Sequence, residues 1–430
     1  MKRIRTGVLE MAKCKYLIVG GSHAALSAAD SIRLIDREGP ITMVNREDLL
    51  PYSPTILPYV ISGKADPNRI FLRDEEALKR MNVRYLPGAS VEEVNPEAGC
   101  AVLSSGERIE YEKLLLATGA SPALAPIDGL AEVPYHVLRT LEDALKLRRD
   151  IREGSSAVVI GAGLVGMHAA ESMATSGMNV TVVEAEANVL PGYFDEVSGR
   201  MILDVFQRNG VRIIAGSRIV GVSRQKGASI VELSTGEILS AEVILSATGV
   251  KPNTSCVKGA GIEMNRGVLV DNRMRTSTEG IWAAGDVTQA DDFFDRQKQL
   301  NATLPDATEQ GRIAGMDMAG DPLPREYRGG ISMNVFRFFG NRALSIGRVG
   351  CGEDEEGIEV DHVFLPGAGK YQKLVFQEDR LVGTVAINTD IDPGIMYESI
   401  RRRIDLGDRK GAFADKPQEI GRILMTSSWR

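Results

Sequence analysis

Two stretches of the chain, about 140 residues apart, repeat one pattern of apolar and polar positions. In the first, a short strand pattern at 15–19, apolar from residue 16, precedes a turn that begins at Gly20 and ends at Ala25. Small and apolar residues typical of a helix then continue to about residue 37, and a second apolar run occupies 41–44. Short, fully apolar runs are typical of buried parallel strands, so this stretch predicts a βαβ unit.

The second stretch repeats the same order of elements. An apolar run at 157–160 leads into the turn from Gly161 to Gly166, a helix is expected to about residue 176, and another apolar run covers 180–183. Two units at this spacing indicate two similar βαβ domains and not a solenoid.

Both units have a matching segment further along the chain. Residues 114–119 and 243–249 are buried-strand runs that end in Ala-Thr-Gly, and a third apolar run at 280–286 ends in Gly-Asp. Shorter stretches typical of β-structure precede the two closing runs, at 101–103 and 230–233. Each domain is therefore expected to complete its sheet with later strands.

A helix is predicted at 306–319, after which the pattern changes to that of strands. These strands are expected at 331–339, 344–349, 363–365, 371–376 and 381–386, with a helix at 394–403. The fold class is therefore α/β, with two Rossmann-like βαβ domains and a separate C-terminal α+β domain. The expected boundaries are 13–125 with 251–322 for a discontinuous first domain, 126–250 for the second domain and 325–430 for the third.

Composition and charge limit the function classes. A chain of 430 residues is too long for one hydrophobic core. The net charge of −7 argues against a nucleic-acid binder, which needs a basic surface. No apolar run approaches the roughly 20 residues that cross a bilayer. The start, residues 1–5, is basic, but the first apolar run, 16–19, is too short for a signal-peptide core. We expect a cytoplasmic protein that binds neither nucleic acid nor a membrane.

The four cysteines, Cys14, Cys100, Cys256 and Cys351, are far apart and form no CxxC or Cys/His cluster. An iron–sulfur cluster, a zinc site or a dithiol site within this chain is therefore not expected, and we assign no metal ligands.

The motif Gly161-x-Gly163-x-x-Gly166 follows a predicted strand and opens a predicted helix, which is the context of a dinucleotide site. In that context the first Gly makes the turn, the second admits a pyrophosphate, and the third lets the helix pack on the strand. Glu184, at the end of the next strand, is placed to accept hydrogen bonds from ribose hydroxyls. No Arg follows it to receive a 2′-phosphate, so NAD is favoured over NADP.

The first turn departs from this motif, because Ser22 and Ala25 replace its second and third glycines. Asn45 occupies the strand-end position where a carboxylate usually binds ribose, and its amide can both donate and accept. His23 lies in the same turn, at a helix N-terminus, where the dipole disfavours a protonated ring. The turn by itself is compatible with a ligand or with none.

The sequence resembles the FAD-dependent pyridine-nucleotide oxidoreductases, a superfamily that includes NADH-dependent rubredoxin, ferredoxin and nitrite reductases, NADH oxidases and coenzyme A disulfide reductases. The resemblance runs from about residue 13 to the end. It rests on the two Gly-rich turns, both Ala-Thr-Gly closures, Gly285-Asp286 and Glu309-Gln310-Gly311-Arg312. It implies that the first domain binds FAD and the second NAD. The Tyr371-Gln372-Lys373-Leu374-Val375 segment is similar to the nitrite- and rubredoxin-reductase branch, and the wider family usually dimerises through this domain. A self-contained, solvated domain is the alternative.

The resemblance also implies which residues line the cofactors. Asp286 is expected to bind the ribityl chain or phosphate edge of FAD. The FAD-binding residues would be Gly20, Gly21, Ser22, His23, Ala24, Ala25, Asn45, Arg46, Pro54, Thr55, Val91, Ala117, Thr118, Gly119, Gly285 and Asp286. The NAD-binding residues would be Gly161, Gly163, Leu164, Val165, Gly166, Glu184, Ala247, Thr248 and Gly249.

Two departures from the family concern the reacting groups. Thr55 stands where the thiol-bearing branch has its cysteine, so this chain lacks the nucleophile for disulfide or peroxide chemistry. Thr55 either hydrogen-bonds the flavin or is a buried packing residue. Pro58 and His168 stand where other relatives pair a Lys with a Glu. His168 either meets the nicotinamide or flavin as a catalytic residue, or is a structural histidine.

Two further patterns in the sequence also have two interpretations each. The stripe of Met333, Phe336, Phe338 and Phe339 is either a strand core or dimer contact, or a guard at the flavin edge. The run 401–403, three arginines, is either a solvated helix face or an attractor of an acidic electron carrier.

We expect a flavoprotein that passes a hydride between NAD(H) and FAD and exchanges electrons with a separate iron–sulfur or other redox protein or enzyme subunit. A stand-alone NADH oxidase or small-acceptor reductase is the second hypothesis, and a nucleotide sensor without turnover is the third. The sequence leaves open the partner, the direction of electron flow and the oligomeric state.

Overall fold

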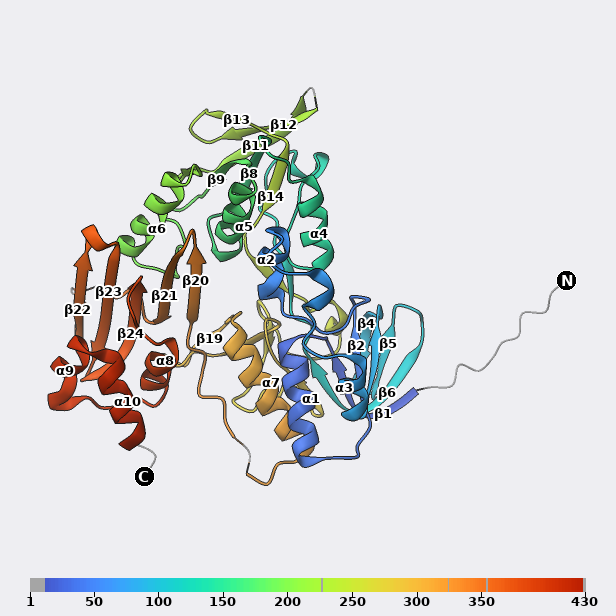
Figure 1. The fold of residues 1–430 in the computed structure, drawn as a ribbon. Helices are drawn as coiled ribbons and strands as arrows, with labels where there is room; N and C mark the ends of the chain where they lie inside the picture. The colour runs from blue at the N-terminus through green and yellow to red at the C-terminus, as the bar shows by residue number, and fades with distance from the viewer. Residues whose placement is uncertain (1–11, 226, 324, 353–354, 428–430) are drawn as a thin grey trace. The chain divides into compact units, whose positions relative to one another are not determined.

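A computed structural model describes residues 12–225, 227–323, 325–352 and 355–427 (Figure 1). The basic residues 1–5 and the last three residues of the expected third domain lie outside these ranges. The chain forms two compact units. The first comprises Met1–Ser53, Asn68–Ser121 and Val250–Gly330, and the second comprises Pro54–Pro67, Pro122–Gly249 and Ile331–Arg430.

The first unit is built on a sheet in the order β3-β2-β1-β6-β5-β4, with β17 paired to β6. Its strands β3, β2, β1, β6 and β17 are parallel, and β5 and β4 extend it antiparallel. Tyr16, Leu17 and Ile18 of β1 are fully buried, as a central parallel strand requires. The strands are β1 (Ala12–Val19), β2 (Ile41–Asn45), β3 (Val83–Pro87), β4 (Val91–Asn95), β5 (Cys100–Leu103), β6 (Arg108–Leu116) and β17 (Ile281–Ala283).

Helices α1 (His23–Ile35) and α7 (Leu304–Ala319) of the first unit pack side by side (Figure 1). Two glycines of α7 make the close approach possible. A Cβ atom on Gly311 would lie 2.2 Å from the carbonyl oxygen of Ala24, and one on Gly315 would lie 2.4 Å from that of Ala28. The unit also contains α3 (Glu75–Arg80) and the short strands β15 (Val250–Pro252), β16 (Val268–Leu269), β18 (Thr288–Asp291) and β19 (Lys298–Gln299).

The second unit contains the repeated βαβ pattern in a parallel sheet of order β10-β9-β8-β14. Beside it lies a three-stranded antiparallel sheet, β11-β12-β13. The strands are β8 (Ser156–Ile160), β9 (Asn179–Val183), β10 (Arg212–Ile214), β11 (Ile219–Gln225), β12 (Ala228–Leu233), β13 (Ile238–Ala241) and β14 (Val243–Ser246). The helices are α2 (Leu57–Ile61), α4 (Leu141–Asp150), α5 (Leu164–Thr175) and α6 (Glu196–Arg208).

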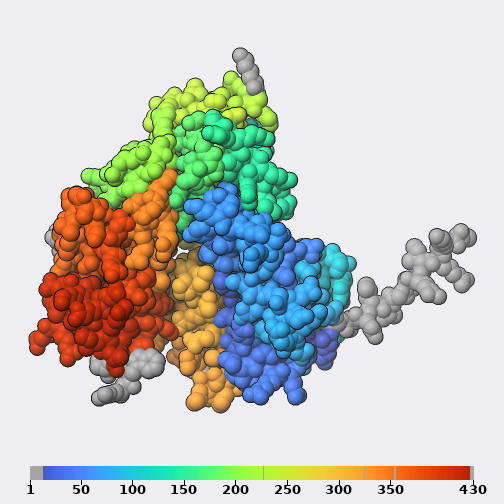
Figure 2. Space-filling model, viewed as in Figure 1, coloured from blue at the N-terminus to red at the C-terminus, as the bar shows by residue number. Residues whose placement is uncertain are grey.

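The C-terminal part of the second unit is an antiparallel sheet of order β20-β21-β24-β23-β22, accompanied by three helices. Figure 2 shows its orange surface in contact with the green segment that carries α6. The strands are β20 (Met333–Phe338), β21 (Asn341–Gly347), β22 (Ile358–Leu365), β23 (Lys370–Gln377) and β24 (Arg380–Ile387). The helices are α8 (Pro393–Arg401), α9 (Lys410–Asp415) and α10 (Pro417–Ser427).

The expected α/β class, with two parallel-sheet βαβ units and a C-terminal α+β part, is confirmed. One departure is β22, predicted only at 363–365 but observed from Ile358 to Leu365. As an edge strand it is exposed over most of its length, so burial imposes no alternation on its sequence. Helices α2, α3, α4, α6, α9 and α10 were not predicted.

Candidate dinucleotide-binding sites

In the second unit, two glycines of the turn are required by the fold and one faces open space. Gly161 has φ +99°, and a Cβ on it would lie 2.7 Å from the carbonyl oxygen of Ala247. A Cβ on Gly166 would lie 2.0 Å from the carbonyl oxygen of Gly161. A Cβ on Gly163 would meet no heavy atom within 4 Å. The space beside Gly163 is thus where a pyrophosphate fits.

The start of α5 suits a phosphate group. Gly163 is its N-cap and brings no side chain to satisfy the first-turn amides, which include those of Leu164 and Val165. Unsatisfied amides and the positive end of the helix dipole attract anions. The residues of this turn therefore fit a dinucleotide.

Glu184 lies at the carboxyl end of β9 and is 8% exposed. One carboxylate oxygen accepts a hydrogen bond from the N–H of Ala162 at 2.6 Å, and the other accepts one from the N–H of Glu186 at 2.9 Å. These bonds fix the carboxylate beside the turn, where it can accept further bonds from ribose hydroxyls. A 2′-phosphate would meet its negative charge, which favours NAD over NADP.

The closing segment of the second unit, 243–249, binds the backbone of a distant segment. Ala247 donates its N–H to Ile160, and Gly249 has φ +106°. The hydroxyl of Thr248 donates to the carbonyl of Ala123 at 2.6 Å, so it has a structural partner.

The first unit has the same kind of hydrogen bond between its closing segment and a distant residue. The hydroxyl of Thr118 donates to the carbonyl of Asn253 at 2.7 Å, while the amide of Asn253 donates to the carbonyl of Thr118 at 2.9 Å. Ala117 donates its N–H to Val19, and Gly119 has φ +66°. The Thr hydroxyl of the repeated Ala-Thr-Gly motif therefore has the same structural role in both units, which is to bind the backbone of a distant segment.

The turn of the first unit is as tight as that of the second. Gly20 has φ +137°, and a Cβ on it would lie 2.1 Å from the carbonyl oxygen of Ala117. A Cβ on Gly21 would lie 2.7 Å from Cγ of Asn45. Ser22 is the N-cap of α1, but its hydroxyl turns to the carbonyl of Tyr52 at 3.4 Å and does not cap the helix. The amides of this helix start thus have no side-chain cap, which fits the phosphates of FAD.

His23 and Asp286 lie near each other at the same turn. His23 Nε2 is 2.8 Å from the hydroxyl of Ser53. Burial lowers the pKa of His23, partly offset by the negative charge of Asp286. The neutral ring is therefore favoured, as the helix dipole led us to expect.

Gly285, which lies close to the start of α1, is held by a residue that sequence reasoning did not assign. The buried side chain of Gln310 accepts from the N–H of Gly285 at 2.8 Å and from the hydroxyl of Thr288 at 3.0 Å. A Cβ on Gly285 would lie 3.2 Å from Cβ of Ala24. Ala25, the next residue along α1, is buried. The Gln in Glu309-Gln310-Gly311-Arg312 was the available signal.

The side-chain amide of Asn45 makes more hydrogen bonds within the protein than expected. Its amide nitrogen donates to the carbonyls of Glu47 and Leu49, at 3.0 and 3.4 Å, and to the hydroxyl of Tyr85 at 2.9 Å. The donor side of this amide already binds the adjacent loop. Of the two expected capacities toward ribose, to donate and to accept, only the capacity to accept therefore remains. Of the other predicted FAD residues in this unit, Arg46 is exposed and Val91 packs against the core.

Pro54 and Thr55 belong to the second unit, in a single 3-10 turn before α2. Thr55 is exposed, so its interpretation as a buried packing residue is wrong. In the same unit the carbonyl of Pro58 accepts from the hydroxyl of Ser172, one turn beyond His168 on α5. The positions of the missing Lys and Glu therefore lie on neighbouring elements.

His168 packs against an aromatic cluster of the C-terminal sheet. Its ring lies edge-on to Phe336, with centroids 4.6 Å apart, and burial lowers its pKa to about 4. Phe336 and Phe338 are buried and stack on each other at 4.9 Å, and both face Phe206 of α6. The strand-core interpretation of the aromatic stripe is thus confirmed for Phe336 and Phe338, and His168 has a structural contact.

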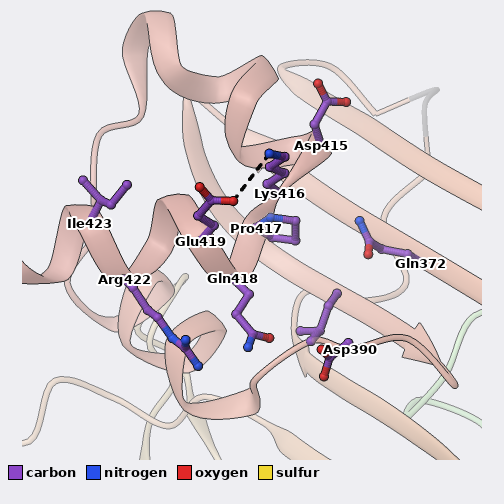
Figure 3. Close-up of a pocket in the computed structure, with 10 residues that line it drawn as sticks. Gln372, Asp390, Asp415, Lys416, Pro417, Gln418, Glu419, Arg422 and Ile423 are labelled. Carbon is purple, nitrogen blue, oxygen red and sulfur yellow. Dashed lines mark ion pairs between the residues drawn. The ribbon is translucent and has the colours of Figure 1, made fainter.

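A pocket in the C-terminal part of the second unit lies apart from every predicted site residue in sequence (Figure 3). Gln372, Asp390 and Gln418 line it, and an ion pair of 3.5 Å joins Lys416 to Glu419 at its side. Its walls carry both charges, and Gln372 of the Tyr371-to-Val375 segment contributes to them, whereas the glycine-rich turns and the Ala-Thr-Gly segments do not.

Within the described ranges, no group of three or more His, Cys, Asp or Glu residues is arranged to hold a metal ion. Nor does any helix there combine the length and the apolar character that crossing a membrane demands. Arg401 and Arg402 both pair with Glu398, which reduces the positive charge of that helix face.

Comparison with known proteins identifies the family of this chain. A profile of the family described as "Pyridine nucleotide-disulphide oxidoreductase" matches residues 14–311. The "NADH-dependent phenylglyoxylate dehydrogenase subunit epsilon" of Aromatoleum evansii is 48% identical over 97% of this chain and 98% of that protein. The "Rubredoxin-NAD(+) reductase" of Pseudomonas putida is 26% identical over 90% and 98%. A solved "NAD-Dependent Persulfide Reductase from A. fulgidus" is 26% identical, with a TM-score of 0.82 over 92% of this chain and 78% of that one.

Proposed function

The chain belongs to the pyridine nucleotide-disulphide oxidoreductase family, and on that premise we propose that it is the NAD(H)-reacting subunit of a multi-subunit dehydrogenase. It is an FAD-dependent NAD(H) oxidoreductase, as the resemblance implied. In the proposed complex, electrons removed from a 2-oxo acid by other subunits reach this chain and leave it on NAD. The 48% identity to a dehydrogenase subunit, over nearly the full length of both chains, is the observation that carries this proposal.

The residues have distinct proposed roles in the two cofactor sites. FAD, when bound, would supply the chemistry of hydride exchange with the nicotinamide ring. We assign 13–125 with 251–322 to FAD binding, 126–250 to NAD binding and 325–430 to an interface domain. The turns at Gly20 and Gly161 hold the pyrophosphates, Asp286 holds the ribityl or phosphate edge of FAD, and Glu184 orients the NAD ribose.

The need for an external redox protein follows from the side chains. Thr55 has no thiol to accept electrons, and all four cysteines are buried and free. A buried thiol is a poor nucleophile, since burial raises the pKa of Cys256 to about 11 and also raises the pKa of Cys14. The two-electron flavin would then exchange single electrons with an iron–sulfur or similar centre on a partner. Free cysteines also suit a reducing compartment, and we propose the cytoplasm.

The proposal is tested with the purified, FAD-loaded chain in the absence of oxygen. NADH should bleach the flavin absorbance, and a low-potential acceptor, either ferredoxin or a viologen dye, should restore it rapidly. In air without additions, NADH consumption should be much slower. Rapid consumption of NADH by oxygen alone would favour a stand-alone oxidase, and failure of NADH to bleach the flavin would favour a nucleotide sensor.

A further inference from the structure

A buried polar cluster joins the C-terminal sheet to the start of α6, and both elements belong to the second unit. The hydroxyl of Tyr371 on β23 donates to the carboxylate of Asp195 at 2.6 Å. The same carboxylate oxygen lies 3.7 Å from the ammonium of Lys373. Tyr371 is 4% exposed and Lys373 8%. Two residues apart on one strand, their side chains lie on the same face of the sheet.

The lysine is fully engaged despite its burial. Its ammonium donates to the carbonyls of Cys351 and Val349 at 2.7 and 3.2 Å, in addition to facing Asp195. A buried charge without such partners would be strongly destabilising. The cluster is therefore a fixed attachment between two elements.

Asp195 ends the segment that runs from the NAD ribose position to α6. It is the N-cap of α6 and accepts from the N–H of Ser198 at 2.9 Å. Within the preceding segment, 185–194, the N–H of Leu190 donates to the carbonyl of Ala162 at 2.9 Å. Leu190 is fully buried and has φ +52°, a backbone conformation that a non-glycine residue keeps only where its surroundings enforce it.

The peptide units of Ala162 are thus held from two sides. Its N–H is bound by Glu184 and its carbonyl by Leu190. Ala162 directly precedes Gly163, whose open side receives the pyrophosphate in the proposed function. The shape of the NAD turn therefore depends on the segment that ends at Asp195.

We propose that Tyr371 and Lys373 are positioning residues for NAD binding. By fixing Asp195 they hold segment 185–194, and through Leu190 they hold the turn at Ala162 in the form that receives the dinucleotide. This inference rests on the proposed function. It gives the Tyr371-x-Lys373 motif of the C-terminal sheet a role in the dinucleotide site, although neither residue lies in the NAD-binding segment.

The test uses the FAD-loaded full chain and three variants. Tyr371→Phe removes only the hydroxyl and keeps the ring contact with Phe364 at 6.0 Å. Lys373→Met removes the ammonium. Lys370→Met, at the exposed start of β23, is the matched control. The measurements are the KM for NADH and the kcat with ferricyanide, the dissociation constant of NAD, the FAD content and the melting temperature.

We expect Tyr371→Phe to raise the KM for NADH and the dissociation constant of NAD about fivefold, an ordinary size for coupling through packed elements. Its kcat at saturating NADH and its FAD content should match wild type, as should every property of Lys370→Met. A lower melting temperature with unchanged KM and NAD affinity would overturn the inference, because the cluster would then be structural only. If Lys373→Met fails to fold, Tyr371→Phe decides alone. If wild type itself does not bind NADH, the proposed function fails instead.

Discussion

The carboxylate of Glu184 accepts a 2.6 Å hydrogen bond from the backbone N–H of Ala162, inside the glycine-rich turn of the second unit. The corresponding residue of the first unit, Asn45, donates its amide to an adjacent loop. The two repeats therefore differ in hydrogen bonding at the positions proposed to bind ribose. Glu184 offers a carboxylate that backbone hydrogen bonds hold in place. At Asn45, only the side-chain carbonyl oxygen takes no part in the bonds to the loop.

Glu184→Gln should weaken NADH binding. Replacing the carboxylate removes charge-assisted hydrogen bonds to ribose, each of which contributes about 1.5–3 kcal/mol, so the KM for NADH should rise about tenfold or more. Steady-state kinetics with ferricyanide provide the measurement, and the discrimination against NADPH should decrease as well. The FAD content serves as the control. An unchanged KM would remove Glu184 from the NAD site.

Gly163→Ala and Gly166→Ala form a matched pair in one turn. The new Cβ of Gly163→Ala points into open space, and its φ of −73° is acceptable for alanine. This variant should keep the melting temperature of wild type and lose NAD affinity, because the methyl group occupies the pyrophosphate position. Gly166→Ala should destabilise the fold, since its Cβ would lie 2.0 Å from a carbonyl oxygen. Calorimetry of unfolding and of NAD binding tests both. Full NAD affinity in Gly163→Ala would contradict the placement of the pyrophosphate.

Gly20→Ala should reduce both stability and FAD content. The turn requires φ +137°, and the new Cβ would lie 2.1 Å from the carbonyl oxygen of Ala117. Gly106→Ala is a suitable control, because Gly106 also has positive φ, +83°, but no atom within 4 Å of the added Cβ. The control should lose only about 1–2 kcal/mol, through backbone strain. The absorbance ratio at 450 and 280 nm reports bound flavin. Equal FAD content in the two variants would show that the tight turn does not support the cofactor.

Acid should destabilise the second unit through His168. Burial lowers its pKa in the folded chain from 6.5 to about 4, so between these values the unfolded chain binds more protons. The contribution of the neutral ring to stability is complete above pH 6.5 and is lost as the pH falls toward 4. From pH 7 to pH 5, wild type should lose about 2 kcal/mol more than His168→Gln. Denaturant titrations at both pH values give the comparison. An equal loss of unfolding free energy in both proteins would mean that folding does not lower the pKa of His168.

Several features followed from the sequence because they depend on local chemistry. Fully apolar runs such as 16–19 and 157–160 are buried in parallel sheets because only strands with two covered faces tolerate them. The glycines at 161, 163 and 166 indicated a dinucleotide turn because each answers a separate steric requirement. The α/β class and the NAD turn were accessible for this reason, whereas FAD was expected only from the family resemblance.

Tertiary structure decided what depends on residues far apart in the chain. The sequence left Thr55 between two interpretations, and its exposure excluded one of them. It left His168 between catalysis and structure, and the tertiary structure placed its ring against Phe336 of a distant strand and lowered its pKa by burial. It gave no role to Tyr371 and Lys373, because their partner Asp195 lies about 180 residues earlier. Local patterns encode strands, turns and caps, whereas the burial of a charge or ring depends on which distant element covers it.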